Sequence, residues 1–564
     1  MLQPCGELRS LLWTPGLAER VACFLDSNDV PCGLRLVNKA TAALFSRDHD
    51  LIVRLARPVS HTEFARRWGA HGALMSWTLA ERRRLMCLIA ASGVLPNLEL
   101  VADAAGCPLP ADVWTAASHS GHLHVCEWLL RRGCPERGAA LPAAAAAGHL
   151  AVCDWLLTRA GGLWCNAALV AAAQAGQLEA LLWLLLRRNP GPRVARGPSG
   201  WPLLVSILGA VAEGCDLATL RCLHLQLLGS AGATDGPTGA CHTDAGTSDF
   251  LRELGASILT ALRPSDQPQE AVAAAAAASS GAGRQLALTH ILAHAAGSPT
   301  PDWAAKVEWL EAQGCPRCAE ALLIAAGRPD ALERLAWLRR RGYPVSGEAV
   351  ARAAAGPHGA AAIAAVRYLL AQGARAGIDA AVAAVRAGHL AAMEALREAN
   401  CPVASHRALC EAASRGDLEA VAWLVDEAGA AGLLDTDVFE WAARSGRVEL
   451  LAWLRRRGCP CNSGDLFEAA ADAGCVAALE WLASAEYGMP DDGRPFLAAG
   501  ANGDEAALRC LCRLGCPWGP SGEVFTTIVR SGARLALLAG LVEAGCPVDW
   551  APAGGQSSKS AGFK

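Results

Sequence analysis

Cysteine pairs are the residues of this sequence whose spacing comes nearest to metal chemistry. Cys315 and Cys318 are separated by two residues, which is the spacing of a zinc knuckle. Such a site needs a second cysteine or histidine pair, and none stands at the expected separation. Cys510, Cys512 and Cys516 are also close together, but they fall on positions predicted to be helix and helix end. We therefore predict no metal site and no cofactor.

Histidine recurs in a second pattern, Gly-His-Leu, at His122, His149 and His389. A histidine can act as a general acid or base when a nucleophile or carboxylate is placed beside it. The sequence shows no Gly-rich phosphate loop, no nucleophile elbow and no His-Glu-x-x-His motif. A recurring histidine fits hydrogen bonding to a neighbouring turn better than catalysis. We predict that the chain is not an enzyme.

Tryptophan marks a third recurring position, and a leucine follows it each time: Trp128, Trp155, Trp183, Trp309, Trp337, Trp423, Trp453 and Trp481. A row of aromatic side chains could form a ligand surface. The neighbouring leucines favour a hydrophobic core between repeats instead. Both interpretations predict that these tryptophans occupy equivalent positions in successive structural repeats.

The returning unit is clearest at Ala116–Pro135, which reads AASHSGHLHVCEWLLRRGCP. Ala442–Pro460 reads AARSGRVELLAWLRRRGCP, and within each run of repeats the glycines equivalent to Gly446 recur every 27 to 30 residues. Such a period belongs to a supersecondary unit rather than to one helix. A chain of 564 residues is too long for one compact core but suits a stack of such units.

Each unit is predicted to hold two helices. Around Gly474, the first helix is Asp465–Ala473 and the second is Val476–Ser484, both with apolar residues at helical spacing. The glycine ends the first helix because it accepts a positive φ, and Gly-Cys-Pro ends the second because proline cannot continue it. Helix starts are expected where serine precedes an acid: at Ser346, Ser463 and Ser521.

The second half of the unit resembles an ankyrin repeat. The matching residues are Gly121-His122-Leu123, Val125, Trp128-Leu129-Leu130 and Gly133. The period is shorter than the 33 residues of ankyrin repeats, and Asp465–Glu468 replaces the usual Thr-Pro-Leu-His. The resemblance implies an all-α, ankyrin-like helical repeat solenoid that binds other proteins, with short loops in place of projecting hairpin fingers.

A different segment, Trp13–Phe45, precedes the repeats and resembles an F-box. The resemblance rests on Pro15, the spaced Leu17, Val21 and Leu25, on Asp29-Val30, and on Val37-Asn38-Lys39. It departs at Thr14, where a leucine is usual, and at Thr41 or Ala42, where an aromatic residue is expected. F-boxes dock on the adaptor subunit of a cullin-RING (SCF-type) ubiquitin ligase. The residues that the resemblance assigns to this docking are Pro15, Leu17, Val21, Leu25, Val30 and Leu34. The alternative is a small helical cap that covers the first repeat.

The composition of the chain favours some classes of binding partner and some cellular locations over others. The net charge of −4 argues against nucleic acid as main partner. The apolar run Ala160–Leu178 is in phase with the repeat and broken by glycine, so it predicts packed helices and no membrane span. Met1–Trp13 lacks the apolar stretch of a cleavable signal. Cysteines that precede proline at unit ends favour free thiols, and hence an intracellular, cytoplasmic protein.

The predicted domain order is an F-box-like segment (13–57), a first ankyrin-like block (85–228), a low-complexity insertion (229–283), a second block (284–550) and a disordered tail (551–564). The insertion is expected to be largely disordered, with room for a short helix. Two functions remain open. One is the substrate-recognition subunit of a ubiquitin ligase, and the other is a non-catalytic scaffold with no ubiquitin role.

Overall fold

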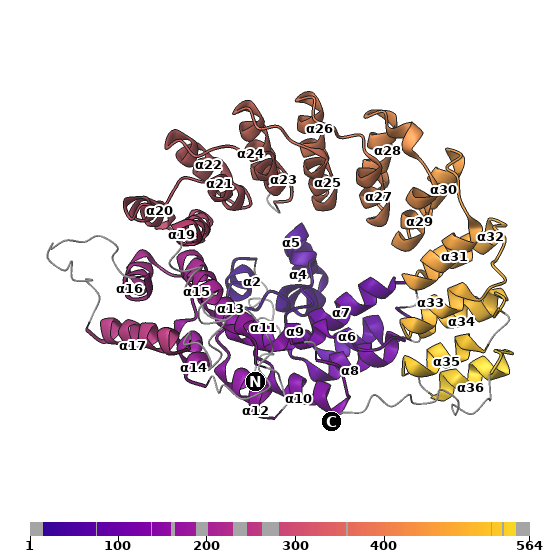
Figure 1. Cartoon of the computed structure of the whole chain (residues 1–564). Coiled ribbons are helices and arrows are strands. Elements are labelled where there is room, and N and C mark those ends of the chain that lie inside the picture. The colour runs from indigo at the N-terminus through magenta and orange to yellow at the C-terminus, as the bar shows by residue number, and fades with distance from the viewer. Residues whose placement is uncertain are drawn as a thin grey trace, which may run out of the picture. The chain divides into compact units, whose positions relative to one another are not determined.

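The computed structural model describes residues 15–70, 72–74, 76–136, 138–159, 164–187, 201–228, 245–261, 281–356, 359–519, 522–532 and 535–548 (Figure 1). Over these ranges the chain is all-α, and no strand is present. It divides into two compact units. Unit 1 holds the described residues of 1–64, 85–98 and 110–408, and unit 2 holds those of 65–84, 99–109 and 409–564. Trp13, Thr14 and the predicted tail lie outside the described residues.

Unit 1 begins with short helices, and helix pairs follow. The short helices are α2 (Pro15–Ala22), α3 (Asp29–Cys32), η1 (Leu34–Leu36), α4 (Lys39–Leu44), α5 (Asp48–Leu51) and α6 (His61–Trp68). Four helices carry residues of both units: α6, α7 (Leu79–Ser92), α8 (Leu95–Ala104) and α27 (His406–Ser414).

In the paired region of unit 1, the first helices of successive pairs pack on one another in a row. They are α9 (Asp112–His119), α11 (Ala140–Ala146), α13 (Asn166–Gln174), α15 (Trp201–Gly214), α19 (Gly281–Ala296), α21 (Ala319–Ala325), α23 (Gly347–Ala354) and α25 (Ile378–Ala387). The second helices are α10 (Leu123–Arg131), α12 (Leu150–Thr158), α14 (Leu178–Arg187), α16 (Leu217–Leu228), α20 (Trp303–Ala312), α22 (Ala331–Arg340), α24 (Gly359–Ala371) and α26 (Leu390–Glu398). The predicted helical repeat is confirmed.

Unit 2 continues the same pairing. Its helices are α27 (His406–Ser414), α28 (Leu418–Asp426), η2 (Ala430–Leu433), α29 (Thr436–Ser445), α30 (Val448–Arg456), α31 (Ser463–Asp472), α32 (Val476–Ser484), α33 (Arg494–Ala501), α34 (Glu505–Leu514), α35 (Glu523–Arg530) and α36 (Leu535–Glu543). The first helices α29, α31, α33 and α35 pack in a row.

The recurring glycine makes the tight turn inside each pair. Gly388 has φ 74° and Gly446 has φ 71°, a left-handed conformation that disfavours residues with a Cβ. One residue after Gly388, the backbone N–H of His389 donates to the carbonyl of Ala384 at 2.9 Å. This bond closes the Schellman motif that satisfies the helix end. The same glycine position also allows close packing, because a Cβ on Gly121 would lie 2.7 Å from the ring of His149 in the next repeat.

Gly-Cys-Pro uses the same geometry at the end of the second helix. Gly458 has φ 68°, and the backbone N–H of Cys459 donates to the carbonyl of Leu454 at 3.1 Å. The cysteine side chain folds back against the unit and is 7 % exposed. A small apolar residue is favoured at this position of the motif because it packs against the last turn of the helix. The cysteine row therefore has a structural cause, and every cysteine that the structure describes is free.

The thiols should react slowly in the folded protein and completely in denaturant. Burial raises the pKa of Cys315, Cys459 and Cys516 to about 12, so almost no thiolate forms near pH 8. Alkylation without reductant, followed by peptide mass spectrometry, should label exposed Cys23 first and these three only after unfolding. A cysteine that stays unlabelled in denaturant until reductant is added would show a disulfide and contradict the prediction.

One of the predicted helix starts differs in detail. The hydroxyl of Ser346 accepts from the backbone N–H of Ala349 at 3.3 Å, as predicted for a cap. Before α31 the cap is Asn462 rather than Ser463, because its longer side chain accepts from the N–H of Gly464 at 3.2 Å. Ser521 lies outside the described residues.

The predicted insertion contains a helix. Helix α17 (Ala245–Ala261) lies within 229–283 and packs on α14 and α16. Its buried residues are Leu251, Leu254 and Ile258, which have the i, i+3, i+7 spacing of an amphipathic helix. The short helix expected within the insertion is therefore present, and it is 17 residues long. Residues 229–244 and 262–280 lie outside the described part of the chain.

A buried lysine joins the repeats on either side of the insertion. Lys306 in α20 is fully buried, and its Nζ donates to the carbonyls of Ala212 (3.1 Å) and Cys215 and to the hydroxyl of Ser298 (2.9 Å). These carbonyls stand at the C-terminal end of α15, where the last backbone acceptors lack helical partners and the helix dipole favours a cation. Helix α15 packs directly on α19, so the array continues past the insertion.

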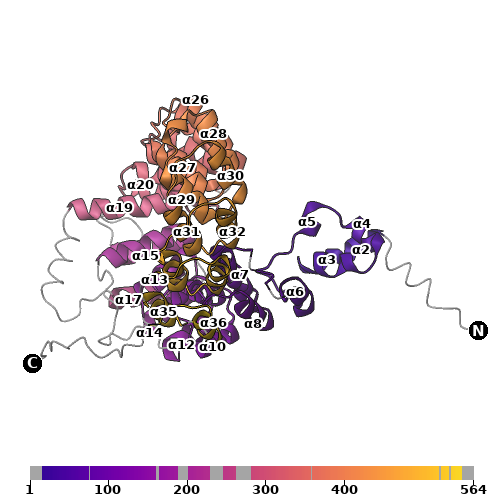
Figure 2. The same ribbon diagram turned by 90° about the vertical axis from the view of Figure 1, so that its right-hand side faces the viewer.

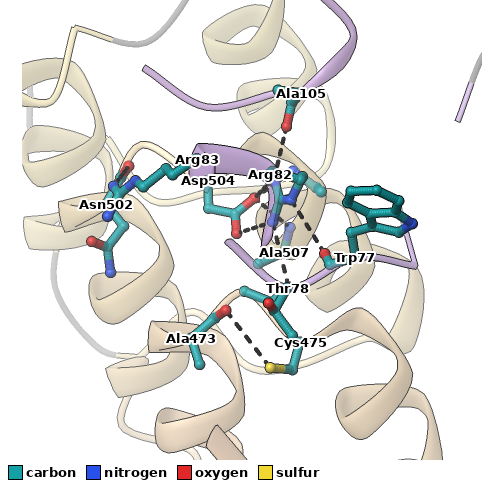
Figure 3. Close-up of polar contacts among 12 residues, drawn as sticks. Trp77, Thr78, Arg82, Arg83, Ala105, Ala473, Cys475, Asn502, Asp504 and Ala507 are labelled. Carbon is teal, nitrogen blue, oxygen red and sulfur yellow. Dashed lines mark hydrogen bonds and ion pairs between the residues drawn. The ribbon is translucent and has the colours of Figure 1, made fainter. Parts of the chain in front are cut away.

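Unit 2 contains a buried ion pair between residues 422 positions apart (Figure 3). Arg82 and Asp504 are both fully buried, and their side chains form two bonds, Nη1 to Oδ1 at 2.9 Å and Nη2 to Oδ2 at 2.6 Å. Arg82 also donates to the carbonyls of Ala105 at 2.7 Å and Trp77 at 3.2 Å. The carboxylate of Asp504 caps α34 by accepting from the N–H of Ala506 at 3.0 Å.

Backbone bonds and close glycine contacts surround this pair. The N–H of Leu79 donates to the carbonyl of Ala473 at 3.0 Å, and the N–H of Glu505 donates to that of Gly106 at 2.8 Å. A Cβ on Gly474 would lie 2.1 Å from an oxygen of Asp504, so only glycine fits there. These contacts hold the early segments of unit 2 against its later repeats.

No helix in the described ranges has the length and apolar character that a bilayer span requires. The apolar run Ala160–Leu178 is divided between α13 and the start of α14 by Gly176, whose φ is 72°. Residues 160–163 of that run lie outside the described ranges.

Candidate partner-binding surface at the N-terminal helices

Helices α2 to α5 form a small cluster with a core of its own (Figure 2). Ala18, Leu34 and Phe45 are the buried residues of this core. Ala22, Val30 and Leu44 pack against it and are partly buried. A core of this size uses few of the apolar side chains that the segment carries, and the rest remain on its surface.

Asn28 fixes the connection between α2 and α3 to the segment that follows α5. Its amide nitrogen donates to the carbonyl of Arg54 at 2.8 Å and to that of Pro58 at 3.1 Å, and its amide oxygen accepts from the N–H of Arg54 at 2.8 Å. No motif in the sequence predicts these bonds. Asn28 is the N-cap residue of α3, but its side chain makes no capping bond to that helix.

The side chains left outside the core are large and apolar. The exposed fractions are 39 % for Leu17, 43 % for Val21, 90 % for Phe24, 36 % for Leu25, 60 % for Leu36 and 51 % for Val37. Exposed apolar groups of this size and density on a small cluster are typical of a protein-binding surface. We refer to these six residues as the N-terminal apolar surface.

The residues that the F-box resemblance assigned to docking divide between this surface and the core. Leu17, Val21 and Leu25 are exposed, whereas Leu34 is buried and Val30 packs against the core. Pro15 begins α2, and its side chain lies outside the described part. Of the predicted helical stripe, Leu17 and Val21 lie on α2, whereas Leu25 lies beyond its end at Ala22. Ala18 and Ala22 form the inward face of α2.

Sequence reasoning missed Phe24, Leu36 and Val37 as surface residues. Phe24 stands between Val21 and Leu25 in an apolar run that the core of this small cluster cannot hold completely. That excess of apolar residues over available core was a signal in the sequence. Which of them face outward was not, because it depends on how the helices pack.

A separate element is tied to the first repeats. The imidazole Nδ1 of His61 in α6 lies 2.9 Å from the side-chain oxygen of Asn97 in α8, and the amide nitrogen of Asn97 donates to the carbonyl of Val59 at 2.9 Å. Phe64 of α6 is fully buried. Residues 59–64 thus perform part of the capping role that the alternative hypothesis gave to Trp13–Phe45.

The recurring histidines bind neighbouring repeats. The ring Nε2 of His122 lies 3.0 Å from the carbonyl of Ala91, and Nδ1 of His389 lies 3.1 Å from that of Ala354. Both carbonyls stand near the end of the first helix of the preceding repeat, where acceptors lack helical partners. Burial lowers the pKa of His122, which favours the neutral ring in the folded protein.

The tryptophan row is less buried than a core would be. Trp128 is 5 % exposed and Trp423 is 6 % exposed, but Trp155, Trp183, Trp309, Trp337, Trp453 and Trp481 are only partly buried. An arginine four residues later covers the ring in several repeats, as in Arg341 over Trp337 and Arg457 over Trp453, each with Cζ 4.7 Å from the ring centre. The row is therefore neither a closed core nor an open ligand surface.

The same arginines link one repeat to the previous one. Arg341 pairs with Glu308 at 3.1 Å, and Arg457 pairs with Asp426 at 2.7 Å. Each arginine thus bridges the ring in its own helix and a carboxylate in the preceding second helix. The cation–π contact and the exposed ion pair each contribute about 1 kcal/mol or less. The tryptophan row therefore stabilises the stack of repeats through the sum of many weak contacts.

No protein-family model matches the sequence, and no curated protein matches it. Matching solved structures include the pentatricopeptide repeat protein PPR10 in complex with an 18-nt psaJ RNA element, at 13 % identity, with 96 % of this chain and 100 % of that chain covered and a TM-score of 0.21. PPR10 from maize matches at 13 % identity, with 97 % and 100 % covered and a TM-score of 0.24.

The chain is an all-α helical repeat protein. The structures named above are pentatricopeptide rather than ankyrin repeats. One of them holds RNA, and this finding corrects the expectation that nucleic acid is not a partner. Net charge is a sum over the whole surface, whereas phosphate is bound by local basic groups, so a value of −4 does not exclude RNA. TM-scores this low do not carry RNA binding over to this chain.

Proposed function

We propose that this protein is a non-catalytic binding module, and that its N-terminal apolar surface docks on the adaptor subunit of a cullin-RING ubiquitin ligase. The repeats would then present a substrate protein. The observation that carries the proposal is the exposure of Leu17, Val21 and Phe24 on a cluster that already has its own core.

Two further points support docking over simple capping. The bonds of His61 and Asn97 tie α6, rather than α2, to the first repeats. Leu17, Val21 and Leu25, which the F-box resemblance assigns to the adaptor, are among the exposed residues. An adaptor of this kind acts inside the cell, which agrees with the free thiols of the described cysteines.

We also propose that the repeats are short ankyrin-type repeats. The turn glycine in the left-handed conformation and the Schellman bond after it are formed in successive units, for example at Gly121 and Gly148. The absence of strands over the described residues agrees with the shortened period, because hairpin fingers would need the residues that are missing.

The purified adaptor should bind the full chain, and Phe24→Ala should weaken that binding about tenfold or more, as expected for an exposed aromatic anchor. Isothermal titration calorimetry measures the dissociation constant. Phe24 is 90 % exposed, so its replacement should leave the fold intact. Leu286→Ala is the matched control, because Leu286 is 74 % exposed but lies on α19.

Two results would contradict the proposal. If the wild-type chain does not bind the adaptor, the scaffold hypothesis without a ubiquitin role replaces it. If Phe24→Ala binds as well as Leu286→Ala, the adaptor uses another surface.

A further inference from the structure

The first helices of unit 2 carry an exposed tryptophan within an acidic setting. Trp441 in α29 is 44 % exposed, whereas the tryptophans of the second helices are buried or partly buried. The opposite side of α29 is occupied by the buried residues Val438, Phe439 and Ala442. Trp441 therefore contributes little to the repeat core and leaves a large aromatic surface open.

Arg444 links this ring to carboxylates on α29 and α31. Arg444 lies over Trp441 with its Cζ 5.5 Å from the ring centre, and it pairs with Glu440 at 3.2 Å and with Asp472 of α31. The carboxylates of Glu440 and Asp472 remain 35 % and 41 % exposed. The ring and the acids are thus held in place by shared ion pairs.

The acidic surface continues onto α33. Arg494 pairs with Asp465 at 2.9 Å, Glu468 at 2.8 Å and Asp492 at 2.6 Å. These three carboxylates are also between 38 % and 42 % exposed. Helices α29, α31 and α33 pack side by side, so the acids of both clusters belong to one row of first helices. Carboxylates outnumber arginines along it, which leaves the surface negative.

We propose that the face of α29, α31 and α33 around Trp441 binds a basic protein segment that places an arginine or lysine against the ring. The free side of an indole attracts a cation through its quadrupole, and the exposed carboxylates around it attract further basic groups. Because the acids are already fixed by Arg444 and Arg494, little side-chain entropy is lost when the partner binds. A phosphate backbone would be repelled by the same carboxylates.

This inference rests on the proposed role of the repeats in presenting a protein. It does not depend on the N-terminal apolar surface. Adaptor binding measured on the same variants separates the two, since a change at Trp441 should leave it unaltered.

The test uses the full chain and fluorescein-labelled nine-residue peptides in which arginine, or glutamate, alternates with leucine. Anisotropy should show binding of the arginine peptide over the glutamate peptide, weakened by added salt because exposed charges are screened. Trp441→Ala should weaken it about tenfold or more. Trp441→Phe should keep most of the affinity. Val529→Ala, at a residue of unit 2 that is 46 % exposed, is the control and should have no effect.

Three outcomes would overturn the inference. Equal binding of both peptides by the wild-type chain would remove the charge argument. Binding of the arginine peptide by Trp441→Ala with the affinity of Val529→Ala would exclude the ring. Binding of an 18-nucleotide single-stranded RNA by the wild-type chain that is lost in Trp441→Ala would assign the face to nucleic acid.

Discussion

Replacing Arg82 by methionine should destabilise unit 2 by about 3–5 kcal/mol, because it leaves the carboxylate of Asp504 buried without its cation. The variant also loses the bonds from the guanidinium to the carbonyls of Ala105 and Trp77. Urea unfolding followed by far-UV circular dichroism measures the loss. Hydrogen exchange should locate it at the amides of Leu79 and Glu505, which bond across the same contact.

Arg84→Met is the matched control, since Arg84 lies on the same helix and is exposed. It should change the free energy of unfolding by less than about 0.5 kcal/mol. The double variant Arg82→Met with Asp504→Leu should recover part of the lost stability, because no buried charge then remains. Equal unfolding curves for Arg82→Met and Arg84→Met would show that the ion pair does not hold these segments together.

Leu454→Ala should destabilise its repeat at least as much as Trp453→Ala does, although tryptophan is the larger side chain. Leu454 is fully buried in α30, so truncation leaves a cavity that costs about 2–5 kcal/mol. Trp453 is partly buried and covered by Arg457, so water fills much of the space that its ring leaves. We expect Trp453→Ala to cost about half of the ~3–5 kcal/mol that is usual for a fully buried tryptophan.

Thermal and urea unfolding of both variants tests this order. Because each repeat is stabilised by its neighbours, the loss should also appear in the exchange rates of α28 and α32. If Trp453→Ala is clearly the more destabilising change, the tryptophan row is a core after all. If it leaves stability unchanged, the row has no packing role and becomes a candidate ligand surface again.

Short-range sequence motifs were enough to predict the helix pair of each repeat. Glycine in the left-handed conformation, the residue after it and the preceding alanine are within a few positions of each other, so the turn at Gly388 could be predicted from the sequence. Gly-Cys-Pro is equally local, and it predicted both the end of α30 and the place of Cys459. Helix pairs and their spacing follow from such short-range bonds, and this is why the all-α repeat fold was predicted correctly.

Which side chains are exposed could be determined only from the packed structure. The spacing of Leu17, Val21 and Leu25 indicated one helical face, but the sequence does not say whether that face is inward or outward. The small alanines Ala18 and Ala22 pack inward because the short helices approach closely, and the larger side chains are left outside. In the same way, the partial exposure of Trp453 follows from the position of Arg457 over its ring.

Long-range polar contacts left no signal in the sequence. Arg82 stands in a basic run that predicts a solvated helix face, and Asp504 precedes a helix as an ordinary N-cap. Their pairing over 422 positions arises only when the early segments of unit 2 meet its later repeats and exclude water from both charges. Short-range hydrogen bonding thus let the sequence determine the repeat, whereas burial and charge pairing between distant segments were decided by tertiary structure alone.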